Sequence, residues 1–264
     1  MRIAVQQCAP YAADVAANLH LLDTAAARAA DAGASLLVGP EMGLTGYNIG
    51  AAAVQQLAEA ADGPSAHAVA DIARRHHLAI AYGYPERDAD GAVFNAAQCL
   101  GADGLRLGQH RKTHLFGALD RAQFSAAAQP SPPFTLNGWQ VGLLICYDVE
   151  FPENTRRLAL AGADLVIVPT ANMLAYDFVA TTLVSTRAYE SQLVLAYANH
   201  CGVESDIRYG GLSTVVAADG TVLARAGRDE ALLIADLDLA RLAASRQRLP
   251  YLADRRPELD TPAR

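Results

Sequence analysis

Residues 141–154, VGLLICYDVEFPEN, contain the feature on which the fold assignment depends. The run 141–145 is entirely apolar or small, so it predicts a buried strand. Pro152 and Glu153 then form a helix-start signal. Cys146 is therefore predicted at a strand-to-helix junction, where backbone N–H groups and the positive end of a helix dipole favour a thiolate. Such a thiol suits a nucleophile, although a single cysteine after an apolar run is also typical of a small buried hydrophobe.

Two further charged residues follow predicted strands. Glu41 comes shortly after the apolar run 35–38 and precedes the glycine-rich loop MGLTGYNIG. Lys112 comes shortly after a predicted strand at 104–109. In open α/β sheets the carboxyl ends of strands are where ligands bind and chemistry is done. We therefore expect Glu41, Lys112 and Cys146 to share one site.

The chain as a whole alternates short β-branched or leucine-rich runs with alanine-rich amphipathic stretches, which is the pattern of βα units. The spacing of Leu19, Leu22 and Ala26 indicates a surface helix with one face toward the core. Strands are predicted at 3–7, 35–38, 79–84, 94–100, 141–145, 165–169, 193–199, 212–217 and 232–236, and helices at 15–32, 64–77, 152–161, 176–192 and 239–245.

Three segments resemble the motif regions of the nitrilase, or carbon–nitrogen hydrolase, superfamily. GPEMGLTGY at 39–47 resembles the glutamate motif, HRKTHLF at 110–116 the lysine motif, and CYDVEFPE at 146–153 the cysteine motif. The order is the same, and the match covers nearly the whole chain. The resemblance implies an α/β fold, the four-layer α-β-β-α sandwich of this superfamily. We expect a single carbon–nitrogen hydrolase domain over residues 1–248 and a C-terminal tail over 249–264, which is either solvated or lies across a partner subunit.

The resemblance also implies roles for individual residues. Glu41 would be the general base, Lys112 a cation that stabilises the tetrahedral intermediate, and Cys146 the nucleophile that forms a thioester. The oxyanion would be held by Lys112 and by the backbone N–H of Tyr147. Many members carry a second acidic residue after the lysine, which orients the lysine or positions the substrate. Its match here is Asp120, whose side chain is shorter than the usual glutamate. This chemistry requires no cofactor and no metal.

The residues near the nucleophile resemble those of amidases acting on small aliphatic amides, in particular 5-aminopentanamidases and related (R)-stereoselective amidases. Nitrile-hydrolysing relatives tend to have Trp-Glu after the cysteine and N-carbamoyl hydrolases tend toward Asn-Asp, whereas this chain has Tyr147-Asp148. We therefore expect cleavage of a short primary amide, with 5-aminopentanamide as the leading example, to carboxylate and ammonia. A terminal ammonium on the substrate needs a carboxylate or an aromatic face. The pocket candidates are Tyr47, Glu150, Asn172, Tyr176 and Asp177.

Other functions stay open at this point. An ω-amidase or deaminated-glutathione amidase would act on an acidic substrate and would need an arginine, for which Arg208 is the candidate. An N-carbamoyl hydrolase is a further alternative. The scaffold could also serve as a catalytically silent binding module, but all three reactive positions are present and unsubstituted.

Composition restricts the partners. The 264 residues are 52% hydrophobic and carry a formal charge of −7, with a pI near 5.4. This argues against nucleic-acid and acidic-membrane partners. The start of the chain, MRIAVQQCAP, enters a strand-like run directly, and no apolar run reaches about 18 residues. We expect a cytoplasmic protein with reduced, scattered cysteines. The family resemblance implies a homodimer or a higher homo-oligomer.

Metal and nucleotide sites are not expected. His110 and His114 are four positions apart, but Lys112 and a predicted turn lie between them and no third ligand is indicated. The loop GLTGYNIG lacks the GxGxxG spacing of a dinucleotide-binding turn.

Overall fold

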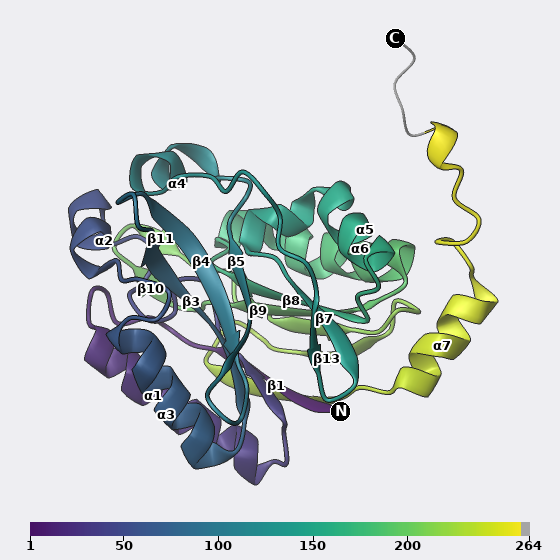
Figure 1. Cartoon of the computed structure of the whole chain (residues 1–264), viewed down its shortest axis with the longest axis horizontal. Helices are drawn as coiled ribbons and strands as arrows, with labels where there is room; N and C mark the ends of the chain where they lie inside the picture. The colour runs from purple at the N-terminus through teal and green to yellow at the C-terminus, as the bar shows by residue number, and fades with distance from the viewer. Residues whose placement is uncertain (260–264) are drawn as a thin grey trace.

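The computed structural model of the chain describes residues 1–259. Within them, two six-stranded sheets form the centre of the molecule (Figure 1). The first sheet has the order β14 (Ala231–Asp236), β1 (Arg2–Gln7), β2 (Leu36–Val38), β3 (Ala79–Arg87), β4 (Val93–Leu100) and β5 (Arg106–Arg111). The second has the order β13 (Val222–Arg225), β12 (Thr214–Val216), β9 (Val194–Asn199), β8 (Leu165–Thr170), β7 (Trp139–Leu143) and β6 (Phe134–Leu136). A separate hairpin pairs β10 (Val203–Glu204) with β11 (Ile207–Arg208).

The direction of the strands decides what lies at each edge. In the first sheet β1, β2 and β3 are parallel, and β4 is antiparallel to both β3 and β5. In the second sheet β7, β8 and β9 are parallel. The carboxyl ends of β2 and β5 therefore lie at the same edge of the first sheet as the amino end of β4.

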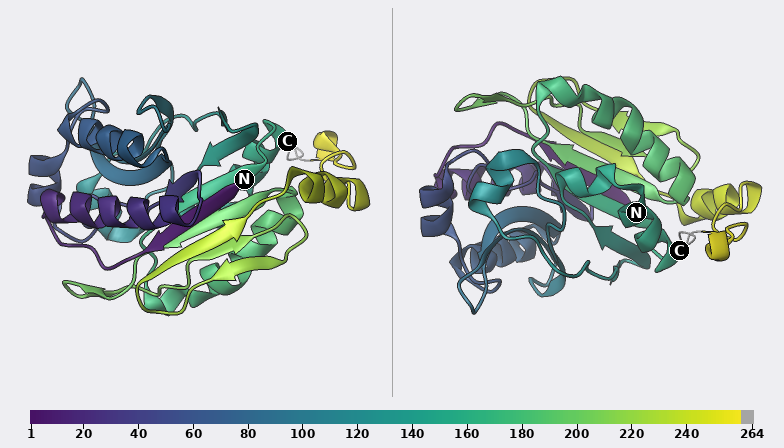
Figure 2. Two further views of the ribbon diagram at one scale, coloured as in Figure 1. Left: turned by 90° about the horizontal axis from the view of Figure 1, so that it is seen from below. Right: turned by 90° about the horizontal axis from the view of Figure 1, so that it is seen from above.

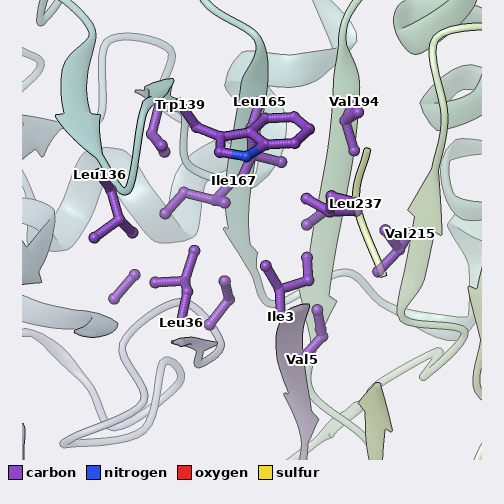
Figure 3. Packing of buried hydrophobic residues seen from close by; sticks show 14 of the residues in the cluster. Ile3, Val5, Leu36, Leu136, Trp139, Leu165, Ile167, Val194, Val215 and Leu237 are labelled. Atoms are coloured by element: carbon purple, nitrogen blue, oxygen red, sulfur yellow. The ribbon is translucent and has the colours of Figure 1, made fainter. Parts of the chain in front are cut away.

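The main core lies between the two sheets (Figure 3). Ile3, Val5 and Leu36 from the first sheet belong to one buried cluster with Trp139 and Ile167 from the second. Because side chains alternate along a strand, the intervening residues point to the outer faces, where helices cover them. Strands that are buried on both faces have nearly continuous apolar sequences, which is why periodicity identified them.

Helices cover both outer faces. Helices α1 (Val15–Asp31) and α3 (Pro64–His76) pack on the first sheet, and α5 (Pro152–Leu160) and α6 (Val184–Ser191) pack on the second. The views from above and below show the two helical layers on opposite sides of the paired sheets (Figure 2). The predicted four-layer α-β-β-α sandwich is confirmed. The helix-start signal at Pro152 is also confirmed, because α5 begins there.

The predicted continuous helix over 176–192 is wrong. The segment contains a 3₁₀ turn at Leu174–Tyr176, a π-helical turn at Val179–Leu183, and only then α6. Its threonines explain the interruption, because Thr181 Oγ1 donates to the carbonyl of Asp177 and Thr186 Oγ1 to that of Thr182. Such bonds to the preceding turn compete with regular helix geometry and bend it.

Several short elements were not predicted. They are α2 (Ala51–Leu57), α4 (Gly117–Gln123), β6, β13 and the β10–β11 hairpin. Neither α2 nor α4 has a side-chain hydrogen bond at its N-cap, so the sequence carries no start signal for them.

The last described segment leaves the sandwich. Helix α7 (Leu239–Arg248) is capped by Asp238, whose side chain accepts from the N–H of Ala240. Figure 1 shows α7 and the residues after it at the periphery of the molecule. Tyr251 then contacts Tyr189 of α6, with 5.8 Å between ring centroids. Residues 260–264 of the predicted tail lie outside the described residues.

Candidate active site

The three residues singled out from the sequence meet where the two sheets adjoin. Glu41 follows β2, Lys112 follows β5, and Cys146 follows β7. Lys112 Nζ donates to Glu41 Oε1 at 2.7 Å, and both side chains are completely buried. The charges of Glu41 and Lys112 both act on the Cys146 thiol, since they shift its pKa. The fold thus brings together three residues that are far apart in the sequence.

Backbone contacts fix the position of Glu41. Its N–H points to the carbonyl of Thr170 at the end of β8, at 3.4 Å. On the other side the chain passes directly over Gly83 of β3, where an added Cβ would lie 2.4 Å from the nitrogen of Met42 and 2.9 Å from the carbonyl carbon of Glu41. Only glycine allows the backbone of another segment so close. Gly83 is therefore part of what places Glu41.

The two carboxylate oxygens of Glu41 differ in their partners. Oε1 accepts from Lys112 Nζ and from Asn95 Nδ2, each at 2.7 Å. Oε2 is buried and has no hydrogen-bond partner within residues 1–259. Burial raises the pKa of Glu41, and Asp120 adds to this, while Lys112 and Asn95 oppose it. Oε2 is thus the oxygen left available to take up a proton.

Cys146 lies at a sharp change of chain direction. Strand β7 ends at Leu143, a 3₁₀ helix spans Cys146–Glu150, and α5 follows. The φ of Cys146 is +46°, a left-handed conformation that residues with a side chain adopt rarely and that clusters at functional sites. Burial and the charge of Glu41 raise the pKa of the thiol, while Lys112 and the backbone of Ala171 lower it. A thiol with a raised pKa needs a base to remove its proton during attack.

Lys112 is held between two carboxylates. Besides Glu41 it donates to Asp120 Oδ2 at 2.7 Å. Asp120 is also completely buried, and it accepts from the Tyr47 hydroxyl and the Phe116 N–H, both at 2.8 Å. Burial alone would lower the pKa of Lys112, but Glu41, Cys146 and Asp120 raise it above its ordinary value. The lysine therefore stays a cation.

Asp148 ties the lysine segment to the cysteine segment. Its carboxylate accepts from the N–H groups of Ile145, Thr113 and His114, from the Thr113 hydroxyl at 2.7 Å, and from His110 Nε2 at 3.0 Å. Burial would raise the pKa of Asp148, but the hydrogen bonds from His110, His114 and Thr113 outweigh it and hold the pKa well below its usual range. His110 and His114 therefore serve Asp148.

The five pocket candidates have different surroundings. Tyr47 is buried with its hydroxyl on Asp120, so it belongs to the lysine's support. Asn172 donates to the carbonyl of Tyr176 and holds that loop, and the exposed ring of Tyr176 contacts Phe116 edge-on at 5.5 Å. Asp177 forms an ion pair with Arg228 at 2.5 Å. Glu150 is half-buried, and its carboxylate has no hydrogen-bond donor within residues 1–259, which leaves it available to a ligand.

Sequence reasoning missed Asn95 and the structural part of Asp148. Asn95 is completely buried near the amino end of β4. Because β4 is antiparallel to its neighbours, its amino end lies at the edge where the parallel strands have their carboxyl ends. A polar residue at the start of an otherwise apolar strand, VFNAAQCL, was the available signal.

No group of three or more His, Cys, Asp or Glu side chains among the described residues is arranged to hold a metal ion. Over the same residues, no helix has the length and apolarity needed to cross a membrane.

The fold and this site define a class of protein, and comparison with known proteins identifies it. The chain matches the model of the carbon–nitrogen hydrolase family over residues 2–247. It therefore belongs to the carbon–nitrogen hydrolase family, within the nitrilase superfamily, and it is an amidase.

Named relatives agree with this class. A Pseudomonas protegens protein named "Hydrolase in pqqF 5'region" is 56% identical over 259 residues, which cover 98% of this chain and 90% of that protein. An (R)-stereoselective amidase from Pseudomonas sp. is 38% identical over 261 residues, or 97% of this chain and 92% of that protein. A 2-oxoglutaramate amidase from Bacillus subtilis is 31% identical over 227 residues, 86% of each chain.

Solved structures show the same similarity. The NitN amidase, titled as from Neterenkonia sp. AN1, superimposes with a TM-score of 0.86 at 36% identity, and the match covers 98% of each chain. Mutants of a Nesterenkonia sp. AN1 amidase have been solved with acrylamide added at the active-site cysteine and in complex with butyramide.

Proposed function

We propose that this amidase hydrolyses short aliphatic primary amides through a thioester on Cys146, with Glu41 as general base and Lys112 as the stabilising cation. The observation that carries the proposal is the free, buried Oε2 of Glu41. Its partner oxygen is occupied by Lys112 and Asn95. A carboxylate held in this way has one oxygen for positioning and one for proton transfer.

The proposed reaction proceeds in two halves. As Sγ of Cys146 attacks the amide carbon, its proton passes to Oε2 of Glu41, and the negative oxygen is met by Lys112 and the N–H of Tyr147. The C–N bond then breaks, and the proton on Glu41 leaves with the nitrogen as ammonia. Water, giving a proton to Glu41, attacks the thioester and releases the carboxylate and the thiol. Proton transfer of this kind is worth about 10²–10⁴-fold in rate, and each oxyanion donor about 10²–10³-fold.

Glu150 supports a substrate with a terminal ammonium. Burial raises the pKa of its carboxyl, and Lys112 and Arg187 oppose this, so the carboxylate lies within electrostatic reach of the catalytic lysine. Arg187 is not its partner, because that guanidinium donates to the carbonyls of Val149 and Glu150 and to Glu190. A half-buried carboxylate without a partner is stabilised by a ligand cation. We therefore infer a preference for ω-amino amides, with 5-aminopentanamide as the leading candidate.

The alternatives have less support. An ω-amidase or deaminated-glutathione amidase would need a cation for the substrate carboxylate, and the candidate Arg208 is exposed on the β10–β11 hairpin. The relative named 2-oxoglutaramate amidase keeps this alternative in the test. An N-carbamoyl hydrolase would also use Cys146, so only its substrate distinguishes it.

The test is ammonia release from 5-aminopentanamide, propionamide, 2-oxoglutaramate, a carbamoyl amine and an aliphatic nitrile. We expect 5-aminopentanamide to be preferred. Glu150→Gln should raise KM for 5-aminopentanamide about tenfold or more, because a charge-assisted contact is lost, and should leave propionamide unchanged. Glu153→Gln, on the exposed first turn of α5, is the matched control. Preference for 2-oxoglutaramate would establish the ω-amidase alternative, and preference for the nitrile or the carbamoyl compound would overturn the substrate assignment.

We also propose that the protein is a cytoplasmic homodimer or higher homo-oligomer, with a domain over residues 1–248 and a tail that contacts a partner subunit. In support, Tyr251 and Arg255 line a hollow of about 890 Å³ together with residues of α5 and α6. Light scattering of the full chain and of a chain ending at residue 248 tests this. We expect dimers for the first and dissociation for the second; a monomeric full chain would contradict the proposal. Cell fractionation tests the location.

A further inference from the structure

The imidazole of His200 lies between two main-chain carbonyl groups behind the catalytic glutamate. His200 follows β9 and is completely buried. Its Nε2 is 2.8 Å from the carbonyl oxygen of Glu41, and its Nδ1 is 3.1 Å from that of Cys8. A carbonyl oxygen only accepts, so the closer contact is favourable when Nε2 carries the proton. The ring then holds the peptide of Glu41 rather than its carboxylate.

His200 and Glu41 also share an anchor. The N–H of each points to the carbonyl of Thr170, at 3.3 Å for His200 and 3.4 Å for Glu41. The Glu41 peptide is thus fixed at its nitrogen by β8 and at its carbonyl by the ring of His200. Rotation of this peptide would swing the Glu41 side chain away from Cys146.

A closed ring of contacts connects His200 to the other face of the site. The imidazole lies against the ring of Tyr209, with 5.1 Å between centroids, and the Tyr209 hydroxyl donates to Glu204. Glu204, on the β10–β11 hairpin, accepts from the N–H of Tyr47 at 3.1 Å. The ring is completed by the Tyr47 hydroxyl on Asp120, by Asp120 on Lys112, and by Lys112 on Glu41. In this ring, His200 is the member that grips the Glu41 backbone.

We propose that His200 is a positioning residue for the general base. Its Nε2–H donates to the carbonyl of Glu41 and keeps Oε2 directed at the Cys146 thiol. The proposal rests on the function proposed above, in which Glu41 is the base. A base displaced by about 1 Å costs on the order of 10²-fold in rate, so one hydrogen bond to the backbone has a measurable effect.

Two conservative substitutions separate the two contacts of the ring. In His200→Gln the side-chain amide N–H₂ can reach the place of Nε2 and donate to Glu41. In His200→Asn it can reach only the place of Nδ1 and donate to Cys8. We expect kcat within about threefold of wild type for the glutamine variant and about 10²-fold lower for the asparagine variant, with KM unchanged in both. The alkylation rate of Cys146 by iodoacetamide, which needs no substrate, should follow the same order.

His200→Phe gives a second donor-free variant, because it keeps a ring against Tyr209. We expect the same loss as for asparagine. His20→Asn, at an exposed position on α1, is the control and should leave both rates unchanged. Equal kcat in the glutamine, asparagine and phenylalanine variants, or a larger loss in glutamine than in asparagine, would overturn the proposal. If wild type releases ammonia from none of the amides while alkylation follows the expected order, the proposed function fails and the positioning role stands.

Discussion

Asn95 donates from Nδ2 to Oε1 of Glu41 at 2.7 Å, the same distance at which Lys112 approaches that oxygen. Two donors on one carboxylate oxygen fix the rotation of the group and leave the second oxygen unpartnered. Asn95 therefore decides which oxygen of Glu41 faces the thiol, although it does not touch the nucleophile itself in any recorded contact.

Replacing Asn95 with leucine should shift the pH dependence of the reaction. The hydrogen bond from Asn95 lowers the pKa of Glu41, so its removal raises that pKa further. A base with a higher pKa is protonated at higher pH, and the acid limb of the kcat/KM profile should move upward. We also expect the plateau kcat to fall roughly tenfold, because the carboxylate loses one of two orienting donors. An acid limb that stays in place would show that Asn95 has no contact with the working base.

Asp148→Asn should destabilise the protein without touching a reacting group. The carboxylate accepts hydrogen bonds from both catalytic segments, and an amide cannot accept them all. We expect a loss of about 1.5–3 kcal/mol in the free energy of unfolding near neutral pH, which is the usual size for hydrogen bonds to a charged group. Urea denaturation measures it.

The pH dependence gives this prediction a sign. The pKa of Asp148 is lowered in the folded state, so its stabilisation is fully present above the unfolded value of about 3.9 and is lost as pH falls toward the folded value. The stability difference between wild type and Asp148→Asn should therefore be large at pH about 5.5 and smaller at pH about 3. A difference that grows in acid would mean that the carboxyl is protonated in the native protein.

Much of the fold and the central triad was accessible from sequence because both have local signals. Strands buried on two faces give continuous apolar runs, and Glu41, Lys112 and Cys146 each follow such a run at a strand end. The support around the triad has no local signal. Asn95 is 54 positions from Glu41 and Asp148 is 35 from Thr113, and such contacts depend on strand register and on the packing of one sheet against the other.

The pocket candidates show the same limit. Asp177 was attributed to a helix N-terminus or a substrate contact, but its partner is Arg228, 51 positions away. Tyr47 was proposed for the pocket, and the fold turns its hydroxyl to Asp120, 73 positions away. For these side chains, residue type and local pattern were not sufficient, because the partner comes from another layer of the sandwich.

Gly83→Ala should disturb the catalytic glutamate through the backbone. The added Cβ would lie 2.4 Å from the nitrogen of Met42, so either β3 or the Glu41 segment must move. We expect a fall of about 1–3 kcal/mol in stability, typical of overpacking, and a fall in kcat beyond what partial unfolding explains. Gly227→Ala is the matched control, since nothing lies within 4 Å of its added Cβ. Full kcat in Gly83→Ala would show that the Glu41 segment does not depend on this close approach.

Asp120→Asn should move the acid limb in the opposite direction to Asn95→Leu. The charge of Asp120 raises the pKa of Glu41, so its removal lowers that pKa, and the base stays ionised to lower pH. At the same time Lys112 loses one of the two carboxylates that hold it, each at 2.7 Å, and the Tyr47 hydroxyl and Phe116 N–H lose a charged acceptor. A less firmly held cation stabilises the oxyanion less well, and we expect kcat to fall about 10–10²-fold. The kcat/KM profile of this variant, measured beside Asp90→Asn in the exposed turn before β4, checks both effects. An acid limb displaced upward would mean that Asp120 does not share the electrostatic surroundings of Glu41, and an unchanged kcat would remove it from the support of Lys112.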